Sequence, residues 1–167
     1  GRLVSYKGIP KLLELWTVLA REREDIHLLL VGPGGVDIYN CEQEAREIVQ
    51  REGLENRVTL TGAVDNVDEF LRASNLYVFP TENDALPLSL LEAMAAGLAP
   101  LTTPVGGIPD VVRDLENGLL VSTENGKALE QGLRRLLDDH DLRVRLGAAA
   151  RNTILEQYTV EAISSKY

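Results

Sequence analysis

Short apolar runs alternate with helix-like patterns along the whole chain, and this alternation restricts the fold more than any other feature. The run at 26–31 is apolar apart from His27 and ends at a glycine-rich turn. Before it, Leu12, Leu13 and Trp16 recur at the spacing of one helix face. Strands that are apolar along their length are typical of a parallel sheet covered on both faces. The pattern therefore predicts an α/β protein.

The same pattern predicts where each element lies. The predicted helices cover residues 9–20, 42–52, 67–73, 88–96 and 108–113, and the last third is helical as well. The predicted strands cover residues 26–31, 57–61, 76–79, 99–102 and 119–121. In the helix at 42–52, Glu42/Arg46 and Glu47/Arg51 have i,i+4 spacing, and we expect Gly53 to end it. These elements predict a Rossmann-like parallel sheet with helices on both faces.

The composition excludes several classes of function. The chain has 167 residues, which suits a single domain over 1–167. Its net charge of −9 argues against a general nucleic-acid surface, which needs a basic stripe. No apolar run approaches the roughly 20 residues that cross a bilayer. The only cysteine, Cys41, excludes an internal disulfide and fits a reducing compartment. We expect a cytoplasmic location, with peripheral membrane association as an option for the full-length protein.

The first residues and the histidines carry two further expectations. Residues 1–4 read as the end of a strand already under way, so we expect a longer chain and a missing partner domain. The two histidines, His27 and His140, lie in an apolar run and at a helix–helix turn. With one cysteine and no further histidine, no zinc site is predicted.

The segment at 80–97 is the strongest candidate for a ligand site. It places Asp84 and Glu92 eight residues apart, on either side of a strand-to-helix junction. In open α/β sheets, ligands bind outside the carboxyl ends of the strands, and a helix N-terminus there favours an anion. A diphosphate with a sugar on each side fits such a site. A structural reading stays open, in which Ser89 and Glu92 form a capping box and Asp84 an Asx turn.

Arg2 and Lys7 flank the turn before Gly8, where two cations would suit a pair of phosphates. The spacing alone favours two solvated surface residues over a phosphate site. The turn at 32–35 resembles a broken dinucleotide fingerprint, for which tight-turn glycines are the better explanation. Gly106 and Gly107 precede a helix that begins with a proline, so we expect their backbone to approach a ligand closely.

Taken together, the motifs resemble a known family over nearly the entire chain. Their order is Gly1-Arg2-Leu3-Val4 with Lys7-Gly8, Leu28-Leu29-Leu30-Val31-Gly32, Arg57-Val58-Thr59-Leu60-Thr61-Gly62, the segment from Asp84 to Gly97, Gly106-Gly107-Ile108-Pro109-Asp110, and Asn117-Gly118-Leu119-Leu120-Val121. This order resembles the C-terminal, donor-binding domain of GT-B glycosyltransferases of the family-4 (group 1) type.

The resemblance implies roles for the charged residues. Arg2 and Lys7 match the basic pair that contacts the donor diphosphate. Glu92 matches the second acid of the E-x7-E motif, which hydrogen-bonds the nucleotide ribose. Asp84 stands where the first acid of that motif, usually glutamate, reaches the donor sugar. Asp84 is one methylene shorter than glutamate, which is a departure from the family pattern.

The resemblance also implies contacts made by backbone groups. Leu86, Leu88 and Ser89 match positions that approach the sugar or the phosphates. Gly62 and Ala63 stand where the family loop packs near the base. Two more departures are Ala85 in place of a common glycine and Asp110 in place of a common glutamate.

By resemblance, the parent protein is a retaining, hexosyltransferase-type enzyme of carbohydrate biosynthesis. Asp84, Arg2 and Lys7 are its implied catalytic residues, and its implied donor is a UDP- or GDP-sugar, with no metal and no cofactor. The implied partners are the missing N-terminal domain of the same polypeptide and, through it, a sugar or lipid-linked acceptor. We expect this chain alone to be inactive.

Two alternatives remain at this stage. A UDP-sugar 2-epimerase-like enzyme has a similar architecture, and product analysis would separate it from a transferase. A non-catalytic α/β binding module would use the same acids as helix caps, and it would show no response to nucleotide sugars.

Overall fold

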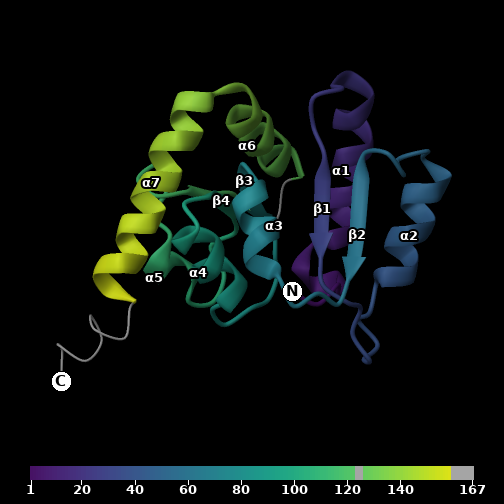
Figure 1. Ribbon diagram of the computed structural model, residues 1–167, viewed down its shortest axis with the longest axis horizontal. Coiled ribbons are helices and arrows are strands. Elements are labelled where there is room, and N and C mark those ends of the chain that lie inside the picture. Colours follow the sequence, from purple (N-terminus) through teal and green to yellow (C-terminus); the bar gives the residue numbers. More distant parts are fainter. Residues whose placement is uncertain (123–125, 159–167) are drawn as a thin grey trace. The chain divides into compact units, whose positions relative to one another are not determined.

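The computed structural model in Figure 1 describes residues 1–122 and 126–158. It contains two compact units, Gly1–Phe70 and Leu71–Tyr167, which we call the N-terminal and the C-terminal unit. Helix α3 (Val67–Ala73) runs across the boundary between them. The prediction of a single domain over 1–167 stays a prediction.

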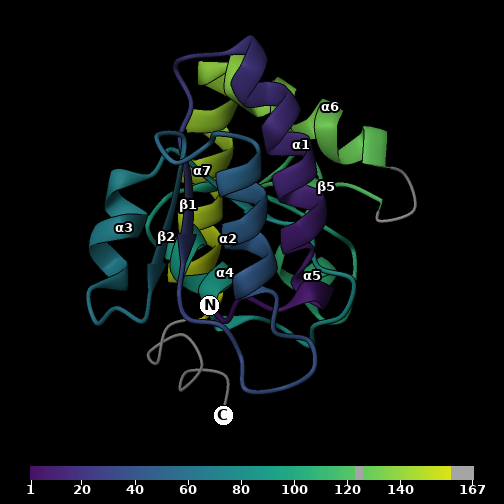
Figure 2. The same cartoon turned by 90° about the vertical axis from the view of Figure 1, so that its right-hand side faces the viewer.

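The N-terminal unit is a parallel strand pair with two helices. Its elements are the 3₁₀ turn η1 (Ser5–Lys7), α1 (Ile9–Glu22), β1 (Leu28–Val31), α2 (Glu42–Arg51) and β2 (Val58–Gly62). β1 and β2 pair in parallel from Leu28 opposite Val58, with a shift in register after Leu30. Helices α1 and α2 pack side by side (Figure 2). The apolar face of α1 that the sequence predicted is buried at Leu12, Leu13, Trp16 and Leu19.

The first residues lie against the turn that follows β1. The Leu3 N–H donates to Pro33 O at 2.8 Å, and Leu3 bridges Gly34 in parallel. The terminal amine of Gly1 donates to Val31 O at 2.7 Å. Leu3 and Val4 thus form only isolated bridges, to Gly34 and Asn40, and the prediction that residues 1–4 end a strand stays a prediction.

The C-terminal unit is a three-stranded parallel sheet, in the order β3-β4-β5, packed with helices. Its elements are β3 (Leu76–Phe79), α4 (Leu88–Ala95), β4 (Ala99–Thr102), α5 (Ile108–Val111), β5 (Leu119–Leu120), α6 (Gly126–Asp138) and α7 (His140–Gln157). The central strand β4 is buried at all four residues, as expected for a strand covered on both faces.

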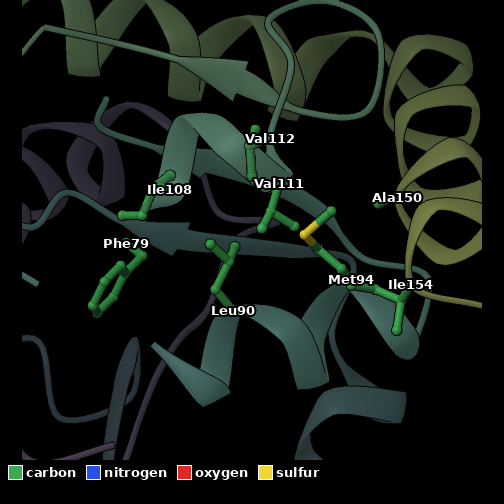
Figure 3. Packing of buried hydrophobic residues seen from close by; sticks show 8 residues of the cluster. All are labelled: Phe79, Leu90, Met94, Ile108, Val111, Val112, Ala150 and Ile154. Atoms are coloured by element: carbon green, nitrogen blue, oxygen red, sulfur yellow. The ribbon is translucent and has the colours of Figure 1, made fainter. Parts of the chain in front are cut away.

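The core of this unit joins the sheet to α4, α5 and α7. Figure 3 shows its members, which are Phe79, Leu90, Met94, Ile108, Val111, Val112, Ala150 and Ile154. Because α4 and α5 each supply part of this core, the loops that precede them are held at the carboxyl ends of β3 and β4. Both units therefore have the α/β Rossmann-like character that the sequence predicted.

Candidate functional site

Buried threonines fix the loop between β3 and α4, residues 80–87, which we call the acidic loop. Thr102 donates from its hydroxyl to Phe79 O at 2.8 Å, and Thr103 donates to Thr81 O at 2.5 Å. The hydroxyl of Thr81 accepts from the Asn83 N–H at 3.3 Å. All three threonine side chains are buried. Because a buried hydroxyl is costly without a partner, these bonds define one conformation for the start of the loop.

The glycine pair after β4 packs directly on the acidic loop. The Gly107 N–H donates to Ala85 O. Gly106 has φ +54, and a Cβ built on it would lie 1.9 Å from Asp84 O. The sequence predicted that these glycines approach a ligand, whereas the structure shows them in contact with the backbone of the acidic loop. Their small size therefore positions Asp84.

Helix α4 begins without a capping side chain. Pro87 is its N-cap, and no side chain of the described residues donates or accepts a capping bond there. Ser89 is the second helical residue and Glu92 the fifth, so the capping-box alternative is wrong. Glu92 is exposed. The Leu90 N–H donates to Pro87 O at 3.0 Å. The N–H groups of Leu88 and Ser89 come before any intrahelical acceptor, which makes this end of α4 suited to an anion.

Tyr77 of β3 links the acidic residues, and the sequence analysis missed it. Its hydroxyl lies 2.8 Å from Ser89 Oγ. Burial raises the pKa of the Tyr77 phenol well above its usual value, and the charges of Asp84 and Glu92 raise it further. Both carboxylates therefore contribute to the electrostatic environment of one phenol. The sequence signal for Tyr77 was a polar group inside a half-buried strand.

The two leucines of the predicted site have different surroundings. Leu86 is half-buried and packs against the core of the C-terminal unit. Leu88, the first residue of α4, is exposed over 73% of its surface. A leucine so exposed at an uncapped helix end contributes little to the fold.

The basic pair lies at the carboxyl edge of the N-terminal unit. Arg2 Nη1 lies 3.0 Å from Asp37 Oδ2, and both side chains are largely exposed. Lys7 ends the turn η1 and is followed by Gly8, which has φ +76 and is the N-cap of α1. Lys7 thus lies beside a helix N-terminus that no side chain of the described residues caps. The sequence did not indicate the pairing of Arg2 with Asp37.

The glycine-rich turn after β1 is filled by the chain itself. A Cβ on Gly32 would lie 2.1 Å from Gly1 O, and the Gly34 N–H donates to Glu42 Oε2 at 2.6 Å. The turn glycines are thus explained by close packing, as predicted. Gly32 also bridges Gly62 at the end of β2, and Ala63 is exposed next to it.

The predicted site residues therefore form two groups. Arg2, Lys7, Gly62 and Ala63 lie at the carboxyl edge of the N-terminal unit. Asp84, Leu86, Leu88, Ser89 and Glu92 lie in the acidic loop and α4 of the C-terminal unit. That both groups surround one ligand stays a prediction.

The described part of the chain contains neither a cluster of metal ligands nor a membrane-spanning helix. Among residues 1–122 and 126–158, no three His, Cys, Asp or Glu side chains gather as metal ligands would. In those same ranges no helix has both the length and the apolar character to cross a membrane.

The family model "Glycosyl transferases group 1" matches residues 1–153. The chain belongs to this family. N-acetyl-alpha-D-glucosaminyl L-malate synthase of Bacillus anthracis is 36% identical over 143 residues, which are 86% of this chain and 36% of that protein. An uncharacterized glycosyltransferase of Haemophilus influenzae is 29% identical over 168 residues, which are 100% of this chain and 46% of that protein. The chain thus spans less than half the length of these two glycosyltransferase relatives.

Solved structures share the fold of this chain. Sucrose-phosphate synthase of Thermosynechococcus elongatus has a TM-score of 0.86 and 30% identity, over 99% of this chain and 42% of that chain. Anabaena HepE, solved in complex with UDP, has a TM-score of 0.87 and 22% identity, over 99% of this chain and 45% of that chain. The predicted fold, that of the C-terminal half of a GT-B glycosyltransferase, is confirmed.

Proposed function

We propose that this chain is the donor-binding domain of a retaining glycosyltransferase of the hexosyltransferase type. The full-length enzyme would transfer a sugar from a UDP- or GDP-sugar to an acceptor hydroxyl. The observation that carries the proposal is the C-terminal unit's arrangement of Asp84 and Glu92 about the uncapped start of α4, in a chain of this family.

In this proposal each group acts on the donor in a defined way. When the bond between the anomeric carbon and the diphosphate breaks, negative charge grows on the β-phosphate. Arg2, Lys7 and the first turn of α4 stabilise that charge, so the reaction needs no metal. Asp84 orients the sugar, and Glu92 binds the ribose hydroxyls. The departing phosphate accepts the proton of the acceptor hydroxyl, which balances the transfer.

In this proposal, acceptor binding is the task of the rest of the protein. We propose that an N-terminal domain supplies the acceptor site, where a sugar or a lipid-linked sugar binds. On this view the present chain binds the nucleotide alone but turns over no donor. We also propose a cytoplasmic location and a reaction that needs no further cofactor.

Titration of the full-length protein with UDP, GDP and their hexose derivatives tests the proposal. We expect one nucleoside diphosphate to bind in the micromolar range and its sugar to be transferred with retention, as seen in the anomeric configuration of the product. Absence of binding at millimolar ligand would refute the proposed function and favour a non-catalytic module. Release of a free 2-epimeric sugar without an acceptor product would identify an epimerase instead.

A further inference from the structure

The hydroxyls of Tyr77 and Ser89 form an isolated pair at the start of α4. They lie 2.8 Å apart, and neither has another hydrogen-bond partner among the described residues. Each hydroxyl has one proton, and only one of the two protons takes part in this hydrogen bond. The other hydroxyl can therefore donate its proton to a different acceptor. The direction of the bond therefore decides which side chain offers a proton to its surroundings.

Either hydroxyl could donate in this pair, and we assign the phenol as the donor. A phenol is a stronger acid than an aliphatic alcohol and thus the better hydrogen-bond donor. The ring of Tyr77 stacks on Phe79 with centroids 6.0 Å apart, which holds the ring and its oxygen in place. The nearby charges of Asp84 and Glu92, together with burial, keep the phenol protonated. Ser89 then accepts from Tyr77 and retains its own proton.

We propose that Tyr77 is a positioning residue, whose bond to Ser89 turns the serine proton toward the diphosphate of the donor. This inference rests on the proposed function, because it concerns the same ligand. Ser89 is the second residue of α4, in a turn that no side chain of the described residues caps. Its hydroxyl thus adds a side-chain donor to the backbone N–H groups that face an anion there.

The test uses the full-length protein and calorimetric titration with UDP and GDP, taking whichever the wild type binds more tightly. Ser89→Ala is expected to weaken binding about tenfold, the effect of one lost hydrogen bond to a charged group. Tyr77→Phe retains the ring and is expected to weaken binding about threefold to fivefold.

The double variant separates positioning from a structural role. If Tyr77 acts through Ser89, Tyr77→Phe/Ser89→Ala binds as weakly as Ser89→Ala alone. Additive losses, or unchanged binding by Ser89→Ala, would overturn the inference. Tyr158→Phe is the matched control: it also removes a phenol hydroxyl, one that lies 3.5 Å from Asp110 O, and it should bind normally. A wild type that binds neither nucleotide would refute the proposed function instead.

Discussion

At the scale of single residues, Gly106 connects backbone conformation to the proposed chemistry. It has φ +54, and a Cβ there would lie 1.9 Å from Asp84 O. A side chain at this position meets two penalties, one from the left-handed backbone and one from the clash. The second penalty falls on the residue proposed to orient the sugar.

Gly106→Ala should therefore cost both stability and donor use. We expect a loss of about 2 kcal/mol or more in the free energy of unfolding, measured by urea denaturation, and a lower kcat. Gly53→Ala is the control, because Gly53 has φ +66 with nothing within 4 Å of its Cβ. That variant should lose only about 1 kcal/mol and retain kcat. Equal losses in the two variants would show that the contact with Asp84 O is unimportant.

Glu92 is exposed and caps no helix end, so its removal should affect nucleotide affinity and leave the stability of the fold nearly unchanged. Glu92→Ala should weaken the affinity for the nucleoside diphosphate about tenfold or more, since a carboxylate that binds two hydroxyls is lost. Its thermal midpoint should stay within about 2 °C of the wild type. Glu156→Ala, which removes an exposed carboxylate from α7, serves as the control for charge. An unchanged dissociation constant for Glu92→Ala would contradict the ribose assignment.

At the scale of elements, α7 depends on small residues where it meets the end of α4. Gly97 follows α4 with φ +82, and a Cβ on Gly147 of α7 would lie 2.1 Å from Gly97 O. Ala150, one turn further along α7, belongs to the core of the C-terminal unit. Glycine inside a helix normally lowers stability, so Gly147 is explained by this close approach.

The substitution Gly147→Ala has two opposing effects on stability, a gain in helix propensity and a loss from overpacking. Propensity alone would stabilise α7 by about 1 kcal/mol, whereas overpacking against a backbone carbonyl costs about 1–3 kcal/mol or more. We expect net destabilisation in urea denaturation. Asn152→Ala, at an exposed position of the same helix, should show the propensity gain alone, up to about 0.7 kcal/mol. A stabilised Gly147→Ala protein would mean that α7 lies further from Gly97.

The elements were predictable because local patterns decide them. The predicted helix at 67–73 and the predicted strands at 76–79 and 99–102 have the bounds of α3, β3 and β4. Side-chain pairing was less predictable, because several partners compete. Arg46 pairs with Glu42 as expected, but Arg51 pairs with Glu52 at 3.0 Å, and Glu47 accepts from Gln43.

The candidate site shows the same limit. The acidic loop and the start of α4 were predicted from one continuous segment. The bond between Tyr77 and Ser89 joins positions twelve apart, and the Gly106 contact joins two loops, so both depend on tertiary packing. The capping-box spacing of Ser89 and Glu92 misled for a related reason, since the helix begins at Leu88 and not after Ser89.

At the scale of the whole molecule, the proposal assigns a role in donor binding to residues of each unit. The acids belong to the C-terminal unit, and the basic pair belongs to the N-terminal unit. Arg2→Ala and Lys7→Ala in the full-length enzyme should each lower kcat by about 10²-fold or more, because they remove charge that stabilises the leaving diphosphate. Lys11→Ala, an exposed cation on α1, is the control. Near-normal turnover in both test variants would remove the basic pair from the mechanism.

In the structure Arg2 pairs with Asp37, so the Asp37 carboxylate and the donor diphosphate would compete for the same guanidinium. Both side chains are largely exposed, and such a pair contributes about 0–1 kcal/mol. A hydrogen bond from Arg2 to a phosphate contributes about 1.5–3 kcal/mol, so we expect the phosphate to displace Asp37 from Arg2. Asp37→Asn is therefore expected to tighten diphosphate binding by less than about fivefold, against a loss of tenfold or more for Arg2→Ala. If Asp37→Asn weakened binding instead, the carboxylate would be orienting Arg2 for the phosphate and not competing with it.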